Sequence, residues 1–343
     1  MTSTPRRAGR VDVASVTMSL VAVLAVIFGL KQIAQDGIAP LPVATIVVGF
    51  AVGAAWARRQ LTLRDPMIDL RLFRIPAFSA SLVVNVLGIF VAVGYFLFVA
   101  QYLQLVVGLH PFAAGLWSLP SAIAMIVGSN VAPRLARRIR PPYLIGASLA
   151  LAAIGLAILA QVGVAEAGGL AVVVVGSIVI SLGLAPVFAL TTDLIVGSAP
   201  ADRAGAASGI SETASELGGA LGISVLGSIG VALYRSGVAK ALPADVPSGA
   251  ASAARDTLGA ATAVAAQLPE AMGATVLAAA RASFVEGMAV AAGISVAVAI
   301  AVAIIAIVAL RNVGRTPEVQ PEDTFRRDER QNLYADPVCA GAA

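Results

Sequence analysis

The stretch that decides the fold is residues 78–105, FSASLVVNVLGIFVAVGYFLFVAQYLQL. It lies within a longer segment, residues 75–133, that contains no Asp, Glu, Lys or Arg. A helix that crosses the hydrocarbon core of a bilayer needs about 20 mostly apolar residues. The apolar run is continuous and does not alternate with a period of two, which favours a helix over a strand. Residues 78–105 are therefore predicted to form a membrane-spanning helix.

The composition of the whole chain agrees with this prediction. Of its 343 residues, 59% are hydrophobic and only 12% are charged, against about 25% charged in a typical soluble domain. This excludes a soluble enzyme, a soluble nucleic-acid-binding protein and a disordered chain. Hydropathy and helix-breaking residues predict an all-α polytopic membrane protein with eight spans, at residues 13–31, 40–57, 78–105, 113–132, 143–161, 170–192, 212–234 and 287–310.

The basic residues predict how these spans are oriented. With a cytoplasmic N-terminus and alternating helices, all but five of the 23 Lys and Arg residues fall in inner segments. Inner loops of membrane proteins carry such an excess of positive charge. Both termini are therefore expected on the cytoplasmic side of the plasma (inner) membrane. Because topology accounts for the net charge of +4, we expect the lipid bilayer as a partner and no nucleic acid.

The spans and the segments between them divide the chain into four regions. Residues 1–62 hold a short basic N-terminus and two accessory spans, and residues 78–311 hold a six-helix bundle. Residues 63–77 are predicted to form an amphipathic linker along the membrane surface, with Asp65 capping a short helix. Residues 235–286 are expected to be an outer loop with one or two short amphipathic helices, around 250–267 and 270–282. Residues 312–343 are expected to be a disordered cytoplasmic tail.

Two glutamates near the start of the seventh span are the best functional candidates. Glu212 and Glu216 are four residues apart, so on a helix they share one face with Cβ atoms about 5–6 Å apart. Two carboxylates that close in a low-dielectric place do not both ionise readily, so one is expected to exchange a proton or a cation. The alternative is that both lie at the inner interface, solvated or paired with Arg203 or an arginine of a neighbouring loop.

Other polar residues of the spans are secondary candidates. Asn85, Gln101 and Gln104 lie on or near one side of the third span, where they either hydrogen-bond between helices or line a cavity. Asp193 ends the sixth span and is interpreted as an interfacial residue, with a place in a translocation path as the alternative. Asp12, at the start of the first span, is expected to be solvated.

Three glycines of the seventh span predict a helix–helix contact, and the scarcity of His and Cys bears on catalysis and metal binding. Gly218, Gly219 and Gly222 lie on nearly one face of a helix, which is typical of close packing between membrane helices. With one His and one Cys in the chain, and no nucleophile beside a base, we expect no enzyme activity, no cofactor and no metal site.

Several segments together resemble the major facilitator superfamily, and within it the fourteen-span drug:proton antiporters that export drugs and quaternary ammonium compounds. The resemblance covers about residues 10–312. It depends on DPMIDLRLF at 65–73, on QYLQLVVG at 101–108 with PFAAGL at 111–116 and Leu-Pro at 119–120, and on ADRAGAASG at 201–209.

This resemblance implies a fold and a function. It implies two accessory spans followed by the C-terminal six-helix bundle, without the N-terminal bundle. Arg137 and Arg140 partly match a basic inner-loop motif of the family, and Glu212 and Glu216 match acidic residues at the start of its thirteenth span. The implied function is that of the C-terminal portion of a proton-coupled efflux transporter for amphipathic or cationic compounds. The alternatives are a half-transporter that works as a homodimer or with a separate N-terminal chain, and a non-transporting remnant or scaffold.

Overall fold

A computed structural model describes residues 12–36, 39–63, 68, 70–163, 168–200, 203–311 and 313. These residues form helices and no β-strand. Eight of the helices are long and apolar enough to cross a membrane, which confirms the prediction of an all-α polytopic membrane protein. They are α1 (Val13–Asp36), α2 (Pro40–Thr62), α3 (Pro76–Gln101), α4 (Pro111–Arg138), α5 (Pro141–Leu159), α6 (Gly169–Ser198), α7 (Ala204–Ala241) and α10 (Glu270–Ala309).

Prolines determine where several of these helices begin. α2, α3, α4 and α5 all start at a proline, and the residue before each of them is extended. Proline fits the first helical position because the amide hydrogen that it lacks would have no partner inside the helix. Its ring also disfavours a helical conformation in the preceding residue. The sequence therefore sets these four boundaries locally.

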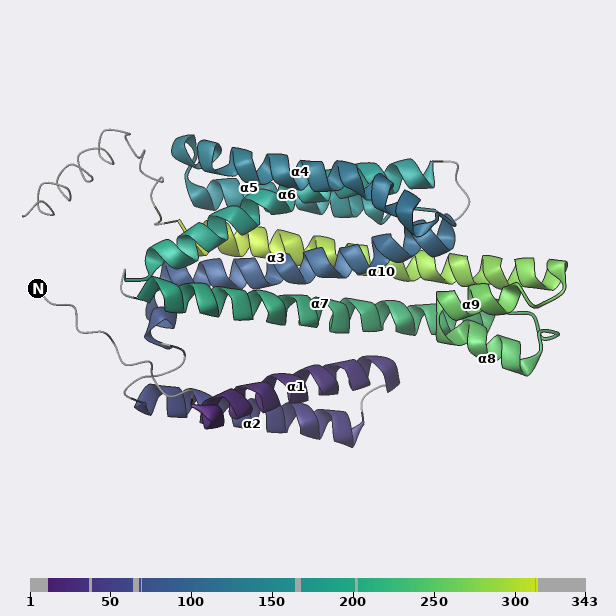
Figure 1. Cartoon of the computed structure of the whole chain (residues 1–343), viewed down its shortest axis with the longest axis horizontal. Coiled ribbons are helices and arrows are strands. Elements are labelled where there is room, and N and C mark those ends of the chain that lie inside the picture. The colour runs from purple at the N-terminus through teal and green to yellow at the C-terminus, as the bar shows by residue number, and fades with distance from the viewer. Residues whose placement is uncertain are drawn as a thin grey trace, which may run out of the picture.

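The helices form a hairpin and a bundle (Figure 1). α1 and α2 pack against each other, and α1 contacts the bundle through α7. Within the bundle α3 packs against α6, α7 and α10. Helix α5 packs against α6 and α10, and α4 packs against α6. In Figure 1 the hairpin lies beside α7. The middle of the molecule is occupied by α3 and α10, and α4, α5 and α6 lie on the far side of them.

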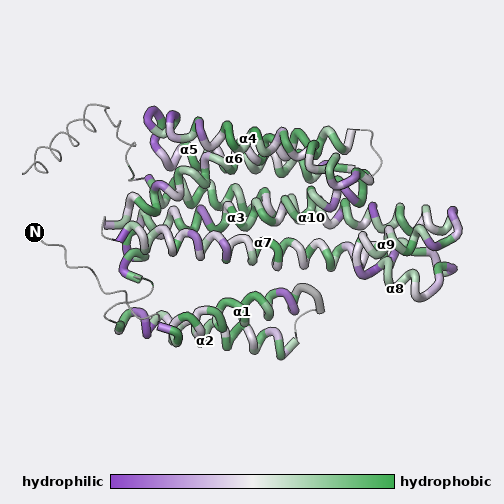
Figure 2. The backbone as a smooth tube through the Cα atoms, viewed as in Figure 1, coloured by the Kyte–Doolittle hydropathy of each residue, from purple (hydrophilic) through white to green (hydrophobic). Residues whose placement is uncertain are grey.

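Burial differs strongly between these helices. In the apolar stretches of α3, α5 and α6, 56–61% of the residues are buried, against 33% in α7 and 22% in α4. In α1 and in α2 the share is 11%. The exposed side chains of these helices are nevertheless largely apolar (Figure 2). Such a surface is stable only against lipid or against another protein surface.

The segment between the seventh span and the last one differs from the expectation. Residues 235–241 are the last turns of α7. Two short helices follow, α8 (Ser248–Asp256) and α9 (Leu258–Ala265), and residues 270–286 are the first turns of α10. The predicted separate helix at 270–282 is therefore wrong. At 40 residues and 1.5 Å per residue, α10 is about 60 Å long, twice the roughly 30 Å of a hydrocarbon core. α7 and α10 extend past the bundle and carry α8 and α9 at their ends (Figure 1).

The linker before α3 is anchored in the bundle. A short 3-10 helix, η1 (Leu70–Arg74), places Leu72 in a buried cluster with Phe78 and Ile195. The ring of Phe73 meets that of Phe78 edge-on, with centroids 5.6 Å apart. At least Leu72 thus packs into the protein rather than onto a membrane surface. The predicted cap at Asp65 and the tail beyond residue 313 lie outside the described residues.

Candidate functional site

The acidic pair lies near the N-terminal end of α7. Both Glu212 and Glu216 are exposed on this helix, and neither makes an ion pair with another described residue. Pairing with Arg203, one of the alternatives that the sequence left open, is not observed for either carboxylate among the described residues. Hydrophilic positions interrupt the apolar surface of α7 mainly in this half of the helix (Figure 2). The arrangement presents two carboxylates on a helix face that the bundle itself does not cover.

A buried polar network ties this part of α7 to α3 and α6. The side chain of Asn85 is 2% exposed. Its Nδ2 donates to Thr191 Oγ1 at 2.9 Å, and its Oδ1 accepts from the Ser215 hydroxyl at 2.9 Å. Thr191 in turn donates to the carbonyl oxygen of Val187 at 2.7 Å. Asn85 therefore connects three helices, and its α7 partner lies directly before Glu216 in the sequence.

Two of the three glycines allow α7 to approach α3 closely. A Cβ atom on Gly218 would lie 2.6 Å from the carbonyl oxygen of Val86, and one on Gly222 would collide with that of Phe90. Both obstacles are backbone atoms, which cannot rotate away. At Gly219 the nearest atom would be a methyl group of Val93 at 3.4 Å, which is an ordinary contact. The close helix–helix approach thus depends on positions 218 and 222.

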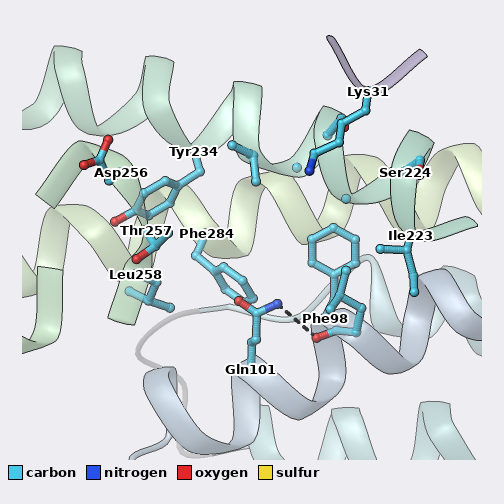
Figure 3. Close-up of a pocket in the computed structure, with 15 residues that line it drawn as sticks. Lys31, Phe98, Gln101, Ile223, Ser224, Tyr234, Asp256, Thr257, Leu258 and Phe284 are labelled. Carbon is cyan, nitrogen blue, oxygen red and sulfur yellow. Dashed lines mark hydrogen bonds between the residues drawn. The ribbon is translucent and has the colours of Figure 1, made fainter. Parts of the chain in front are cut away.

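The remaining candidate residues are spread over the molecule. Gln101 lines a cavity (Figure 3), while Gln104 is exposed on the π-helical turn η2 (Tyr102–Val106). Each donates to a main-chain carbonyl four residues earlier. Asp193 is exposed on α6, and Arg137 and Arg140 are exposed around the α4–α5 connection. None of these five residues is hydrogen-bonded to the acidic pair.

Sequence reasoning missed a polar cluster between the two accessory spans. Nη2 of Arg59 lies 3.1 and 3.0 Å from the two carboxylate oxygens of Asp12. The Ser15 hydroxyl donates to Asp12 at 2.7 Å, and Gln60 donates to Ser15 at 2.7 Å. The hydrogen bond from Ser15, helped by Arg59, lowers the pKa of Asp12 from its ordinary value of 3.8. The expectation that Asp12 is simply solvated was wrong, because pairing between two helices cannot be read from either helix alone.

The described part of the chain contains no candidate metal-binding site. No three residues of the types His, Cys, Asp and Glu come together there in a way that could hold a metal ion.

Comparison with known proteins identifies the family. The profile of the Major Facilitator Superfamily matches residues 13–223. The chain is 35% identical to the multidrug efflux pump LfrA of Mycolicibacterium smegmatis over 307 residues, which are 88% of this chain and 59% of that protein. It is 31% identical to the methyl viologen resistance protein SmvA of Salmonella typhimurium over 84% of this chain and 58% of that protein.

A third relative matches a shorter region. The tetracenomycin C resistance and export protein of Streptomyces glaucescens is 38% identical over 189 residues, covering 52% of this chain and 34% of that protein. The chain spans less than two thirds of the length of these curated relatives. The profile match, and the 35% identity to LfrA over 88% of this chain, show that the chain belongs to the Major Facilitator Superfamily.

Proposed function

We propose that this chain is the C-terminal portion of a multidrug efflux transporter, which exports amphipathic or cationic compounds in exchange for protons. The similarity to proteins named as multidrug efflux, methyl viologen resistance and tetracenomycin C export proteins supports the class of activity. The exposed acidic pair on α7 is the observation that carries the coupling mechanism.

The acidic pair suits proton exchange for a physical reason. Glu212 and Glu216 are one helical turn apart, with about 5–6 Å between Cβ atoms, and no described cation neutralises them. Ionised carboxylates are costly inside a membrane protein unless water or a partner compensates them. A proton, or the positive charge of a substrate, would supply that compensation. If the carboxylates bind a proton and a substrate in turn, the entry of protons is coupled to the export of substrate.

The transporter is proposed to work with a second six-helix bundle. Alternating access requires one bundle or repeat to move against another around a site between them. The weakly buried helices α4 and α7 offer a surface for such a contact. The second bundle would come from another part of the same protein, from a separate chain or from a second copy. Both ends of the present chain are proposed to be cytoplasmic, as its basic residues suggest.

Transport by reconstituted protein tests the proposal. The chain alone, and the chain fused behind the N-terminal bundle of the Mycolicibacterium relative, would be placed in liposomes with an imposed proton gradient. We expect methyl viologen export only from the fused protein. Coupled export by the chain alone would favour the homodimeric half-transporter. No export from either protein would favour a non-transporting scaffold.

Variants of the fused protein test the coupling residues. Glu216→Gln, and Glu212→Gln to a smaller extent, should weaken proton-driven export, and the double variant should abolish it. Glu270→Gln is the matched control, because Glu270 is an exposed glutamate at the start of α10. Unchanged export by the double variant, or an equal loss in the control, would refute the assigned role.

A further inference from the structure

A cavity lies among α3, α7 and α10 in the half of the bundle that carries α8 and α9, with Lys31 of the accessory hairpin at its edge. Its volume is about 320 Å³, within the range of cavities that hold small ligands. Its walls come from the end of α1, from α3, α7 and α10, and from the connection between α8 and α9. We call it the hairpin pocket. It lies at the opposite end of α7 from the acidic pair, so it is separate from the proposed coupling site.

The walls of the hairpin pocket are mainly apolar. The rings of Phe98 and Phe284 form one side, with centroids 6.1 Å apart. A Cβ atom on Gly230 would lie 2.6 Å from the ring of Phe98, so the glycine lets that ring come close to α7. Ile223 forms part of the rim and is 49% exposed. An apolar chain or ring would therefore find both a buried wall and an open side.

Part of the wall is held by a strong hydrogen bond. The Tyr234 hydroxyl donates to the carbonyl oxygen of Ala254 at 2.6 Å. This bond fixes the end of α8 above α7, and the connecting residues Asp256 and Thr257 then close one end of the pocket. The pocket is thus a preformed feature rather than a gap between two loosely placed helices.

Two polar groups in the pocket lack partners. Ser228 lines the pocket and is 6% exposed, yet its hydroxyl makes no hydrogen bond within the described part of the chain. Lys31 likewise makes no ion pair with any described carboxylate. Its ammonium group points into the pocket toward Phe98, whereas the carboxylate of Asp256 lies at the other end and turns away from the rings (Figure 3). The Ser228 hydroxyl is accessible from the pocket, so it can hydrogen-bond to a ligand atom there.

We propose that the hairpin pocket binds an amphipathic anion, with its apolar part against the rings of Phe98 and Phe284 and its phosphate or carboxylate group at Lys31. Lys31 points toward the rings, whereas the Asp256 carboxylate lies at the far end of the pocket and turns away from them. The charge beside the apolar wall is therefore positive, so an anion complements it and an organic cation does not. A charge-assisted hydrogen bond to the ammonium group would provide the polar anchor. The Ser228 hydroxyl would donate a second hydrogen bond to the ligand. Such a ligand is either an anionic phospholipid or a free single-chain anion.

Binding to the purified chain in a neutral maltoside detergent tests this proposal. Native mass spectrometry would compare phosphatidylglycerol, phosphatidylcholine with the same chains, dodecyl phosphate and dodecyltrimethylammonium. We expect one site that prefers the anions. Preference for phosphatidylglycerol that dodecyl phosphate does not displace identifies a lipid site, and binding of dodecyl phosphate without the lipid identifies a site for free anions. Tighter binding of dodecyltrimethylammonium than of dodecyl phosphate would overturn the proposal.

Matched variants assign the binding to this pocket. Lys31→Ala should weaken anion binding about tenfold or more, and Lys31→Arg should retain it. Ser228→Ala should weaken it by a few fold. Lys240→Ala is the control, because this exposed lysine of α7 does not line the pocket. Equal binding by the wild type and Lys31→Ala, or an equal loss with Lys240→Ala, would overturn the proposal.

Discussion

Adding one methyl group to α7 should destabilise the chain at Gly218 and Gly222 but not at Gly219, which lies between them in the sequence. At Gly218 the new Cβ atom would lie 2.6 Å from the carbonyl oxygen of Val86, whereas carbon and oxygen normally approach to about 3.3 Å. α3 and α7 would therefore have to separate by about 0.7 Å. At Gly222 the methyl group would collide with the Phe90 carbonyl in the same way, while at Gly219 there is room.

These distances translate into a measurable loss of stability. Overpacking of this kind costs about 1–3 kcal/mol. One kcal/mol shifts Tm by about 2–4 °C in domains of about 150–250 residues and by somewhat less in a longer chain. We expect Gly218→Ala and Gly222→Ala each to lower Tm by several degrees. Gly219→Ala should leave it unchanged or raise it slightly, since alanine favours helix over glycine by up to about 1 kcal/mol.

The assay is thermal unfolding of the purified variants in one detergent, followed by circular dichroism at the helical band. The three substitutions are chemically identical, so any general effect of alanine in α7 would appear in all three. An equal loss at all three positions, or no loss at Gly218 and Gly222, would refute the proposed close contact between α7 and the backbone of α3.

Two further predictions concern polar contacts between helices. Asn85→Ala removes the hydrogen bonds to Thr191 and Ser215. Each such bond inside a membrane contributes about 0.6 kcal/mol, so the substitution should destabilise the chain by about 1.2 kcal/mol. A decrease in Tm no larger than that of a variant at an exposed serine would contradict this prediction. The hydrogen bonds from Ser15, with a smaller contribution from Arg59, lower the pKa of Asp12, so their stabilisation of the hairpin is present above the ordinary pKa of 3.8 and is lost as the pH falls through the lowered value. The protection of α1 and α2 amides against hydrogen exchange, relative to the intrinsic exchange rate at each pH, should therefore fall at acid pH in the wild type but not in Asp12→Asn. An identical pH profile of protection in both proteins would disprove the assignment.

Local sequence was sufficient for the spans and for most of their starts. A stretch such as residues 78–105 has no charged residue and few polar ones with which to meet water, so it forms a membrane helix whatever its neighbours are. Prolines at the first position of α2, α3, α4 and α5 start those helices without help from tertiary contacts. The glycines at 218 and 222 could likewise be recognised as small residues on a helix face.

The ends of α7 and α10 and the partners of polar residues depended on the tertiary structure. Residues 270–286 carry enough polar side chains to resemble a loop, yet they continue α10 because Phe284 and its neighbours pack into the bundle core. Asn85 could equally have lined a cavity, and only the position of α6 and α7 decided that it bonds to Thr191 and Ser215. The hairpin pocket exists because α1 brings Lys31 next to Phe98 of α3. Hydropathy records how apolar each helix is, but it contains no information about which helix lies beside it, and that arrangement is what creates a site.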